Sequence, residues 1–167
     1  MEFWLENERR PFSSPWALIS IWGDNELLTL PVIEKLKSIG CEHALSSKFS
    51  DVTAENMFKY KMYYGNATLF DEVQAHHIIK FLESNKDSID TLVVHCAAGV
   101  SRSGAVGLFS CRYLNLDEKE FRNTNKMIHP NYYVLSVLNR VSKIKDDYVK
   151  IWEEELNKEK VDGSLIF

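Results

Sequence analysis

One segment of the chain, His95–Gly104, combines the residue types that phosphoryl-transfer chemistry requires. Cys96 could act as a nucleophile, and Arg102, six positions later, carries a planar fork of donors suited to bidentate contact with a phosphate. The residues between them are small or uncharged, so the backbone can curl and direct successive N–H groups inward. Such a nest at the start of a helix binds an anion and lowers the pKa of a neighbouring thiol.

An anion site beside an activated thiol predicts transfer of a phosphoryl group through a cysteinyl-phosphate intermediate. The structural alternative, a buried cysteine at a strand end, would need neither the small-residue loop nor the arginine. Chemistry of this kind needs no metal ion or cofactor, and we expect none. The sequence has no Cys/His cluster with metal spacing, and His76 and His77 would point about 100° apart on a helix.

The segment resembles the signature loop of the cysteine-dependent protein tyrosine phosphatases. Its neutral filling, Ala-Ala-Gly-Val-Ser, is most similar to the small dual-specificity-like branch, which includes compact bacterial and phage members. A second match is His129-Pro130-Asn131, similar to the Pro-Asn-containing helix start that follows the catalytic loop in that branch. The resemblance spans about residues 17–145 in order and spacing.

The resemblance implies a role for each residue of the loop. Cys96 would be the nucleophile and Arg102 the phosphate clamp. His95 would tune the thiolate, and the Ser103 hydroxyl would help the thiolate to leave. The backbone that cradles the phosphate would be that of Ala97, Ala98, Gly99, Val100, Ser101 and Arg102.

The leaving oxygen needs a proton, which an aspartate supplies in this family from a loop upstream. Asp51 is the predicted acid because it lies where a predicted strand runs into a polar segment. Asp71 is the alternative, although the helix dipole alone explains an acid in the first turn of a helix. The segment 51–68 looks longer than the compact family loop. It carries basic and aromatic residues that either grip a phosphorylated ring or form an ordinary solvated loop: Lys59, Tyr60, Lys61, Tyr63 and Tyr64.

The three cysteines do not form a disulfide framework and fit a reducing compartment, so we expect a cytoplasmic protein. Cys41 has two interpretations. We favour a plain buried thiol, and the alternative is a protective disulfide with Cys96, as in some relatives. For Cys111 we expect a plain buried thiol.

Strands and helices that alternate along the chain must position these residues. Short aliphatic runs predict strands at 17–21, 41–49 and 91–94. Helical spacing predicts helices at 31–39, 69–84 and 103–113, a short one from Asp117, and a long one from Asn131 whose apolar stripe continues to Trp152. The helix 69–84 should bury Phe70, Val73, His77, Phe81 and Leu82. The alternation predicts an α/β fold with a central, mainly parallel sheet flanked by helices, and the resemblance implies the protein tyrosine phosphatase-like version.

With 167 residues, the chain fits a single domain. We expect an N-terminal arm at 1–15, a phosphatase domain at 16–157 and a C-terminal tail at 158–167. A net charge of -4 argues against a nucleic-acid partner. The longest apolar run, 16–22, is too short to span a bilayer, and the first residues lack the basic region of a signal peptide.

The expected function is hydrolysis of phosphotyrosine in a phosphorylated protein partner, with phosphoserine and phosphothreonine as further candidates. A phosphoinositide phosphatase would favour a lysine in the loop, which residues 97–101 lack, and an RNA 5′-phosphatase fits poorly with an acidic chain. A catalytically weak phosphate-binding module is the remaining alternative, and the intact Cys96, Arg102 and Ser103 argue against it. The sequence leaves the oligomeric state open.

Overall fold

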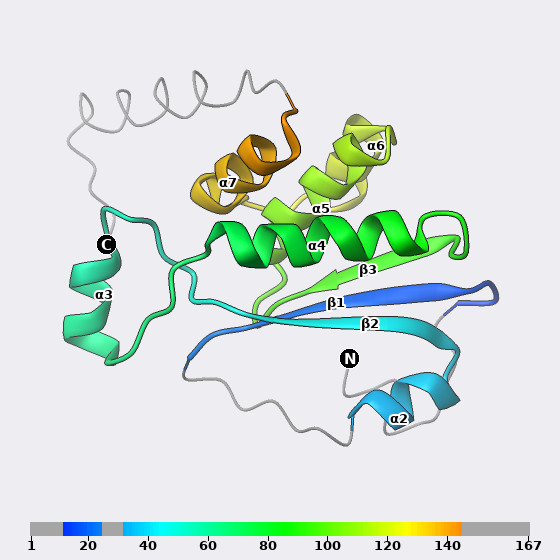
Figure 1. Ribbon diagram of the computed structural model, residues 1–167, viewed down its shortest axis with the longest axis horizontal. Helices are drawn as coiled ribbons and strands as arrows, with labels where there is room; N and C mark the ends of the chain where they lie inside the picture. The colour runs from blue at the N-terminus through cyan, green and yellow to red at the C-terminus, as the bar shows by residue number, and fades with distance from the viewer. Residues whose placement is uncertain (1–11, 25–31, 145–167) are drawn as a thin grey trace.

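Three parallel strands form the sheet in the computed structural model, which describes residues 12–24 and 32–144 (Figure 1). The strand order is β2-β1-β3. The strands are β1 (Trp16–Trp22), β2 (Cys41–Lys48) and β3 (Thr91–His95). The helices are α2 (Val32–Ser38), α3 (Met57–Tyr64), α4 (Glu72–Asn85), α5 (Arg102–Tyr113), α6 (Glu118–Thr124) and α7 (Tyr132–Ser142). The predicted α/β class and parallel sheet are confirmed.

Strand β1 is apolar on both faces because both are covered. Ile19 and Ile21 belong to a core shared with α4, α5 and α7, whereas Trp16 and Leu18 pack with Leu36 of α2 on the opposite side. Figure 1 shows α2 on one side of the sheet and α4, α5 and α7 on the other. Alternate residues of a strand face opposite ways, so burial on both sides explains the nearly continuous apolar run.

The direction in which the sheet grows reverses at β1. The chain moves from β1 to β2 on one side and then crosses back to place β3 on the other. In open α/β sheets, ligands bind at the carboxyl ends of the strands at such a switch point. Strand β3 ends there at His95, directly before Cys96.

Helix α5 is the buried centre of the helical layer, as its apolar pattern predicts. Every residue from Arg102 to Cys111 is buried. Helix α6 packs closely on it at Gly107, where an added Cβ would lie 2.7 Å from Cζ of Phe121. The glycine is therefore required by the close approach of a phenyl ring to the α5 backbone. This packing fixes the helix that follows the candidate nucleophile.

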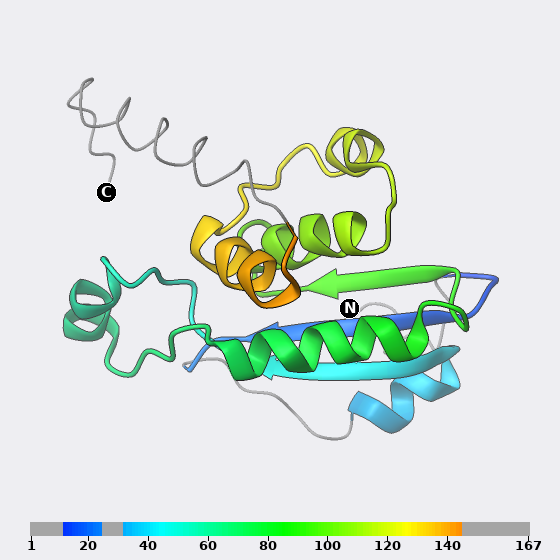
Figure 2. The same cartoon turned by 45° about the horizontal axis from the view of Figure 1, so that its top comes forward.

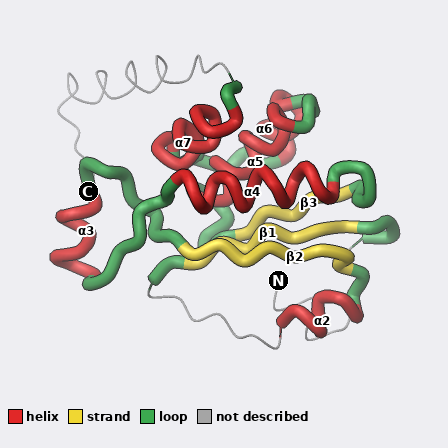
Figure 3. The backbone as a smooth tube through the Cα atoms, in the orientation of Figure 1, coloured by secondary structure: helices red, strands yellow, loops and turns green. Residues whose placement is uncertain are grey.

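Helix α3 forms where the sequence analysis expected only a polar segment (Figure 3). None of its residues is buried, so it has no periodic apolar stripe to reveal it. The turn that precedes it is closed by Thr53 and Asn56, which exchange hydrogen bonds between backbone N–H and side-chain oxygen. It ends at Gly65, whose φ of 86° is readily available only to glycine.

The helix expected at 69–84 is present as α4, and Phe70 and Leu82 are buried as expected, but the rest of its buried face differs from the expected one. Ala75, Ile78 and Leu82 are buried, whereas Val73 is 61% exposed and His77 is also exposed. Two apolar stripes with helical spacing compete in this sequence, and periodicity does not decide which one meets the sheet and α7. The prediction for Val73 and His77 was wrong for that reason.

The long helix expected from Asn131 ends at Ser142, because Lys143 takes a left-handed conformation with φ 58°. The rest of the expected stripe, which comprises Tyr148, Ile151 and Trp152, lies outside the described residues, as do the tail 158–167 and residues 1–11 of the arm. No helix in the described ranges is long and apolar enough to cross a membrane.

Candidate active site

The candidate nucleophile lies at the carboxyl end of β3. Cys96 follows the last residue of that strand, and the chain then curls through residues 97–101 before α5 begins at Arg102. We call residues 96–102 the Cys96 loop. Only 3% of the Cys96 surface is exposed, whereas residues 97–99 are exposed. The thiol therefore lies at the bottom of a loop whose rim is open to solvent.

The loop backbone holds its carbonyl groups away from the thiol. The carbonyl oxygen of Val100 accepts from the N–H of His129 at 3.3 Å, and that of Ser101 accepts from the N–H of Asn131 at 3.2 Å. Gly99 turns the chain in the left-handed region with φ 70°. With the carbonyl groups of these residues engaged outside, the N–H groups of the loop can converge on its interior.

The surroundings of Cys96 favour the ionised form of its thiol. Burial by itself raises the pKa of Cys96, because it withdraws the thiolate from water. The Ser103 hydroxyl, with Oγ 3.1 Å from Sγ, and the backbone N–H groups of Ser103, Gly99 and Val100 oppose this effect by hydrogen bonding. The pKa of Cys96 is consequently lowered from the ordinary value for cysteine.

At the other two cysteines burial prevails: hydrogen bonds with the backbone of His43 and Leu18 lower the pKa of Cys41 less than burial raises it, and no hydrogen bond opposes burial at Cys111. Burial raises the pKa of Cys41 to about 11 and also raises the pKa of Cys111. All three thiols are free. Cys41 is the first residue of β2 and pairs in register with Trp16 of β1, which in turn pairs with Thr91 of β3. Thr91 lies five residues before Cys96. Five strand residues span about 16 Å, far beyond the ~7 Å limit for a disulfide. The disulfide alternative is therefore wrong, and the plain buried thiol is confirmed.

Arg102 and Ser103, at the start of α5, are both 5% exposed. The Nη1 of Arg102 donates to the carbonyl oxygen of Phe49 at 3.1 Å, which ties the Cys96 loop to the backbone that follows β2. Ser103 contacts the thiol directly, as its expected role requires. His95 is half-buried, with its ring 6.1 Å from that of Trp22.

Asp51 lies at the rim of the Cys96 loop. Its Oδ1 accepts from the Ser101 hydroxyl and from the side-chain amide of Asn131, both at 2.8 Å. Asn131 is also the N-cap of α7, where its Oδ1 accepts from the N–H of Val134. One carboxylate oxygen is thus held by two donors fixed to the loop and to a helix end. The structure therefore brings Asp51 to the loop that carries Cys96.

Asp71 has a structural task instead. It is the N-cap of α4, and it forms a capping box with Gln74 at distances of 2.8 and 2.9 Å. The amide of Gln74 also donates to the carbonyl oxygen of Lys48 at the end of β2. The helix-start interpretation of Asp71 agrees with this geometry.

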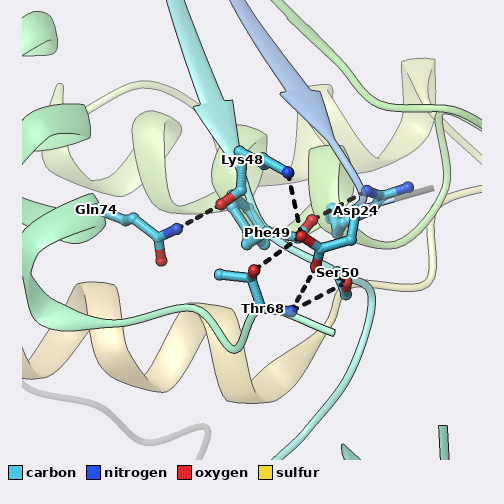
Figure 4. A network of polar contacts seen from close by, with 7 residues as sticks. Asp24, Lys48, Phe49, Ser50, Thr68 and Gln74 are labelled. Carbon is cyan, nitrogen blue, oxygen red and sulfur yellow. Dashed lines mark hydrogen bonds and ion pairs between the residues drawn. The ribbon is translucent and has the colours of Figure 1, made fainter. Parts of the chain in front are cut away.

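Asp24, to which the sequence analysis gave no role, closes the base of the segment that carries Asp51 (Figure 4). Its Oδ2 accepts from the Ser50 hydroxyl at 2.9 Å and from the N–H of Thr68 at 2.6 Å. Its Oδ1 accepts from the Thr68 hydroxyl and forms an ion pair with Lys48. Although burial raises the pKa of this carboxyl, these donors outweigh it, so the pKa of Asp24 is lowered.

The two ends of residues 51–67, which we call the Asp51 segment, are therefore held together. The Ser50 N–H donates to the Thr68 carbonyl oxygen at 2.8 Å. The buried rings of Phe49 and Phe70 pack beside this bond, with centroids 4.6 Å apart. The segment can be long because its base is closed, and Asp51 lies directly at that base.

Several partners were not predictable from the sequence because they come from distant positions. Asp24 reaches Ser50 and Thr68 over separations of 26 and 44 residues, and Asn131 reaches Asp51 over 80. Asn131 belongs to a motif that the sequence shows, but no local pattern connects it to Asp51.

An ionised thiol inside converging N–H donors can bind a tetrahedral anion and attack its central atom. An adjacent carboxyl at the rim can exchange a proton with a group that leaves. Within residues 12–24 and 32–144, no group of three or more His, Cys, Asp or Glu is arranged to hold a metal ion.

Comparison with known structures identifies a similar fold in Tk-PTP, seen in a crystal structure of its active form. The two chains are 20% identical, the match covers 87% of this chain and 88% of that one, and the TM-score is 0.54. The chain therefore has a protein tyrosine phosphatase-like fold, as expected. No protein-family model matches the chain, and no curated protein sequence matches it.

We predict that Asp24→Asn destabilises the protein by about 1.5–3 kcal/mol at pH 7, because hydrogen bonds to a charged group are lost. A folded-state pKa below the unfolded value contributes stability above the unfolded pKa, and this stability is lost as the pH falls through the folded pKa. The difference from wild type should therefore shrink below about pH 4. Urea unfolding at several pH values measures it.

The matched control is Asp87→Asn, which changes an exposed carboxylate and should alter stability by less than about 0.5 kcal/mol. An Asp24→Asn effect of equal size at pH 3 and pH 7 would show that the charge is not what holds the segment.

Proposed function

We propose that the protein is a cysteine-dependent phosphatase that hydrolyses phosphotyrosine in phosphorylated proteins. The observation that carries the proposal is the position of Cys96, buried between β3 and the start of α5, with the Ser103 hydroxyl and backbone N–H groups of its loop directed at the sulfur. A phosphate monoester carries the charge for which such a loop is built. The likeness of fold to a protein tyrosine phosphatase supports the same conclusion.

The substrate phosphate would bind to the backbone N–H groups of the Cys96 loop, with Arg102 as the clamp. Arg102 is always charged, and its planar donor fork suits two phosphoryl oxygens. Its bond to the Phe49 carbonyl oxygen holds the guanidinium beside the loop before substrate arrives. This arrangement would stabilise the charge that develops on the equatorial oxygens in the transition state.

In the first step, the Cys96 thiolate attacks phosphorus, a sulfur–phosphorus bond forms, and the bond to the ester oxygen breaks. Asp51 gives its proton to that oxygen, so the product leaves as a neutral alcohol or phenol. The two hydrogen bonds to Oδ1 of Asp51 favour the proton on its other oxygen, because Oδ1 is already occupied as an acceptor. Asn131 and Ser101 are thus positioning residues for the acid.

In the second step, water attacks phosphorus, Asp51 takes a proton from that water, and the sulfur–phosphorus bond breaks. The Ser103 hydroxyl, already 3.1 Å from Sγ, donates to the thiolate as it leaves. Inorganic phosphate and the starting enzyme result. His95, the last residue of β3, would tune the reactivity of the neighbouring Cys96 thiolate.

The neutral loop sequence supports the small dual-specificity-like branch as the subtype, and the three free thiols support a cytoplasmic location. Phosphoserine and phosphothreonine are accordingly secondary substrates to test beside phosphotyrosine.

Replacement of the nucleophile tests the proposal most simply. Cys96→Ser should abolish hydrolysis of an aryl phosphate, because an alcohol is not ionised at neutral pH. Binding of phosphate or vanadate, measured by calorimetry, should persist, since the cradle is backbone. Cys111→Ala, which removes a buried thiol with a raised pKa, is the control and should retain turnover. Turnover at the wild-type rate in pure Cys96→Ser would refute the mechanism.

Replacement of the acid tests the role of Asp51. Asp51→Asn should lower kcat on the order of 10²-fold for phosphotyrosine, whose leaving group is basic, and much less for an activated aryl phosphate. The alkaline limb of the pH–kcat profile should flatten, because that limb reports loss of the proton from the acid.

Asp71→Asn is the matched control, since asparagine also caps helices and α4 should remain intact. Its pH profile should equal that of the wild type. If the limb disappears in Asp71→Asn and persists in Asp51→Asn, the acid is the other aspartate.

A further inference from the structure

Exposed apolar side chains gather on α3. Four of its eight residues are large, apolar and more than 60% exposed: Phe58 (76%), Met62 (72%), Tyr63 (71%) and Tyr64 (64%). In the described part of the chain, the other large apolar side chains with comparable exposure lie apart from α3: Val73, Leu116 and Met127. A concentration of this kind marks a surface that binds something, because isolated exposed apolar residues are the norm.

The helix is placed to meet whatever enters the active site. It belongs to the Asp51 segment, and Asp51 is hydrogen-bonded to Ser101 of the Cys96 loop. Figures 1 and 2 show α3 apart from the other helices, beyond the ends to which the strand arrows point. Met57 lies six positions after Asp51, and an extended chain of that length spans at most about 20 Å. The same number of residues in a bound peptide would bridge that distance.

The charge of α3 is opposite to that of the chain as a whole. The helix, MFKYKMYY, contains two lysines and no acidic residue, while the chain carries -4. Lys59 and Lys61 are exposed. Phe58 and Met62 form one i,i+4 pair on the outer face, and Lys59 and Tyr63 form the neighbouring pair. The face therefore offers apolar and cationic contacts side by side.

We propose that this outer face of α3 (Phe58, Lys59, Met62 and Tyr63) binds the polypeptide that flanks the phosphorylated residue of a substrate protein. It selects flanks that carry carboxylates together with an apolar side chain. The inference rests on the proposed phosphatase function and names the substrate class for it. The negative charge of the substrate complements Lys59 and the neighbouring Lys61, and its apolar side chain covers the exposed aromatic and methionine surface.

Two other occupants fit the surface less well. A helix that lies on a membrane has its apolar residues on one face and its charged residues on the opposite face. In α3, Lys59 lies on the same face as Phe58, Met62 and Tyr63. A symmetric contact with a second copy would place α3 against itself, and the lysines would then repel one another.

The test compares three substrates by kcat/KM. One is an aryl phosphate too small to reach α3. The second is a phosphotyrosine peptide with acidic residues and a leucine within six positions on either side, and the third has lysine in place of each acidic residue. We expect the wild-type protein to prefer the acidic peptide to the basic one by about tenfold.

Variants of α3 should change only the peptide reactions. Phe58→Ser with Met62→Ser should raise KM for the acidic peptide by about tenfold and leave kcat for the aryl phosphate within about twofold of the wild type. Lys59→Glu with Lys61→Glu should reverse the preference between the peptides. None of the residues of α3 is buried, so these changes should not affect folding. Val73→Ser with Met127→Ser is the control for exposed apolar surface elsewhere and should alter none of the rates.

Equal rates for the two peptides with the wild-type protein would overturn the inference, as would an equal loss on the aryl phosphate and the peptide in the α3 variants. Cosedimentation with phosphatidylserine vesicles, or a dimer in ultracentrifugation, that is lost in Phe58→Ser would assign the surface to a membrane or to a second copy instead. If the wild-type protein does not hydrolyse the aryl phosphate, the proposed function itself fails. Hydrolysis of the aryl phosphate without a preference between the two peptides would contradict the proposed role of α3 and leave the proposed phosphatase function intact.

Discussion

The lowered pKa of the Cys96 thiol depends on a loop whose N–H groups lie close to the sulfur, while the carbonyl groups of Val100 and Ser101 bond outside it. Burial alone raises the pKa of a thiol, and at Cys41 it outweighs two backbone hydrogen bonds and raises the pKa to about 11. Four hydrogen bonds reverse that direction at Cys96, and three of them come from backbone N–H groups. The rest of the fold serves this loop: β3 ends at it, α5 begins from it, and the chain before α7 holds Val100 and Ser101 from outside.

A second set of contacts brings Asp51 to the loop that carries Cys96. Asp24 and the paired rings of Phe49 and Phe70 close the base of the Asp51 segment, and Arg102 binds the Phe49 carbonyl oxygen from the side of the Cys96 loop. Asp51 is then held by donors from that loop and from the N-cap of α7. Because these contacts hold the base of the segment together, α3 can extend from it without burying any of its own residues. That exposed surface is the one we propose for substrate recognition.

The sequence was informative where the pattern is local. A β-branched strand, a small-residue loop and an all-apolar helix lie consecutively at 91–113, so β3, the Cys96 loop and α5 were predictable from residues that are neighbours in the chain. Asp51 was predictable from its place at a strand end. Asp24, Asn131 and the Phe49 carbonyl oxygen were not, because their partners lie 26 to 80 residues away. Helix α3 was not predicted because it buries no side chain and so shows no apolar stripe. The buried face of α4 was predicted incorrectly because its sequence contains two apolar stripes with the same helical spacing.

The most direct measurement of the central claim is the pH dependence of alkylation at each cysteine, followed by mass spectrometry of peptides after treatment with iodoacetamide. Cys96 should react with an apparent pKa below that of an ordinary thiol, and inorganic phosphate should protect it by occupying the loop. Ser103→Ala should move that pKa upward, because one of the donors that lower it is removed. Cys41 and Cys111 should remain unreactive over the same range. If Cys96 titrates at or above the ordinary cysteine value and phosphate gives no protection, the loop does not hold a thiolate and the proposed chemistry is wrong.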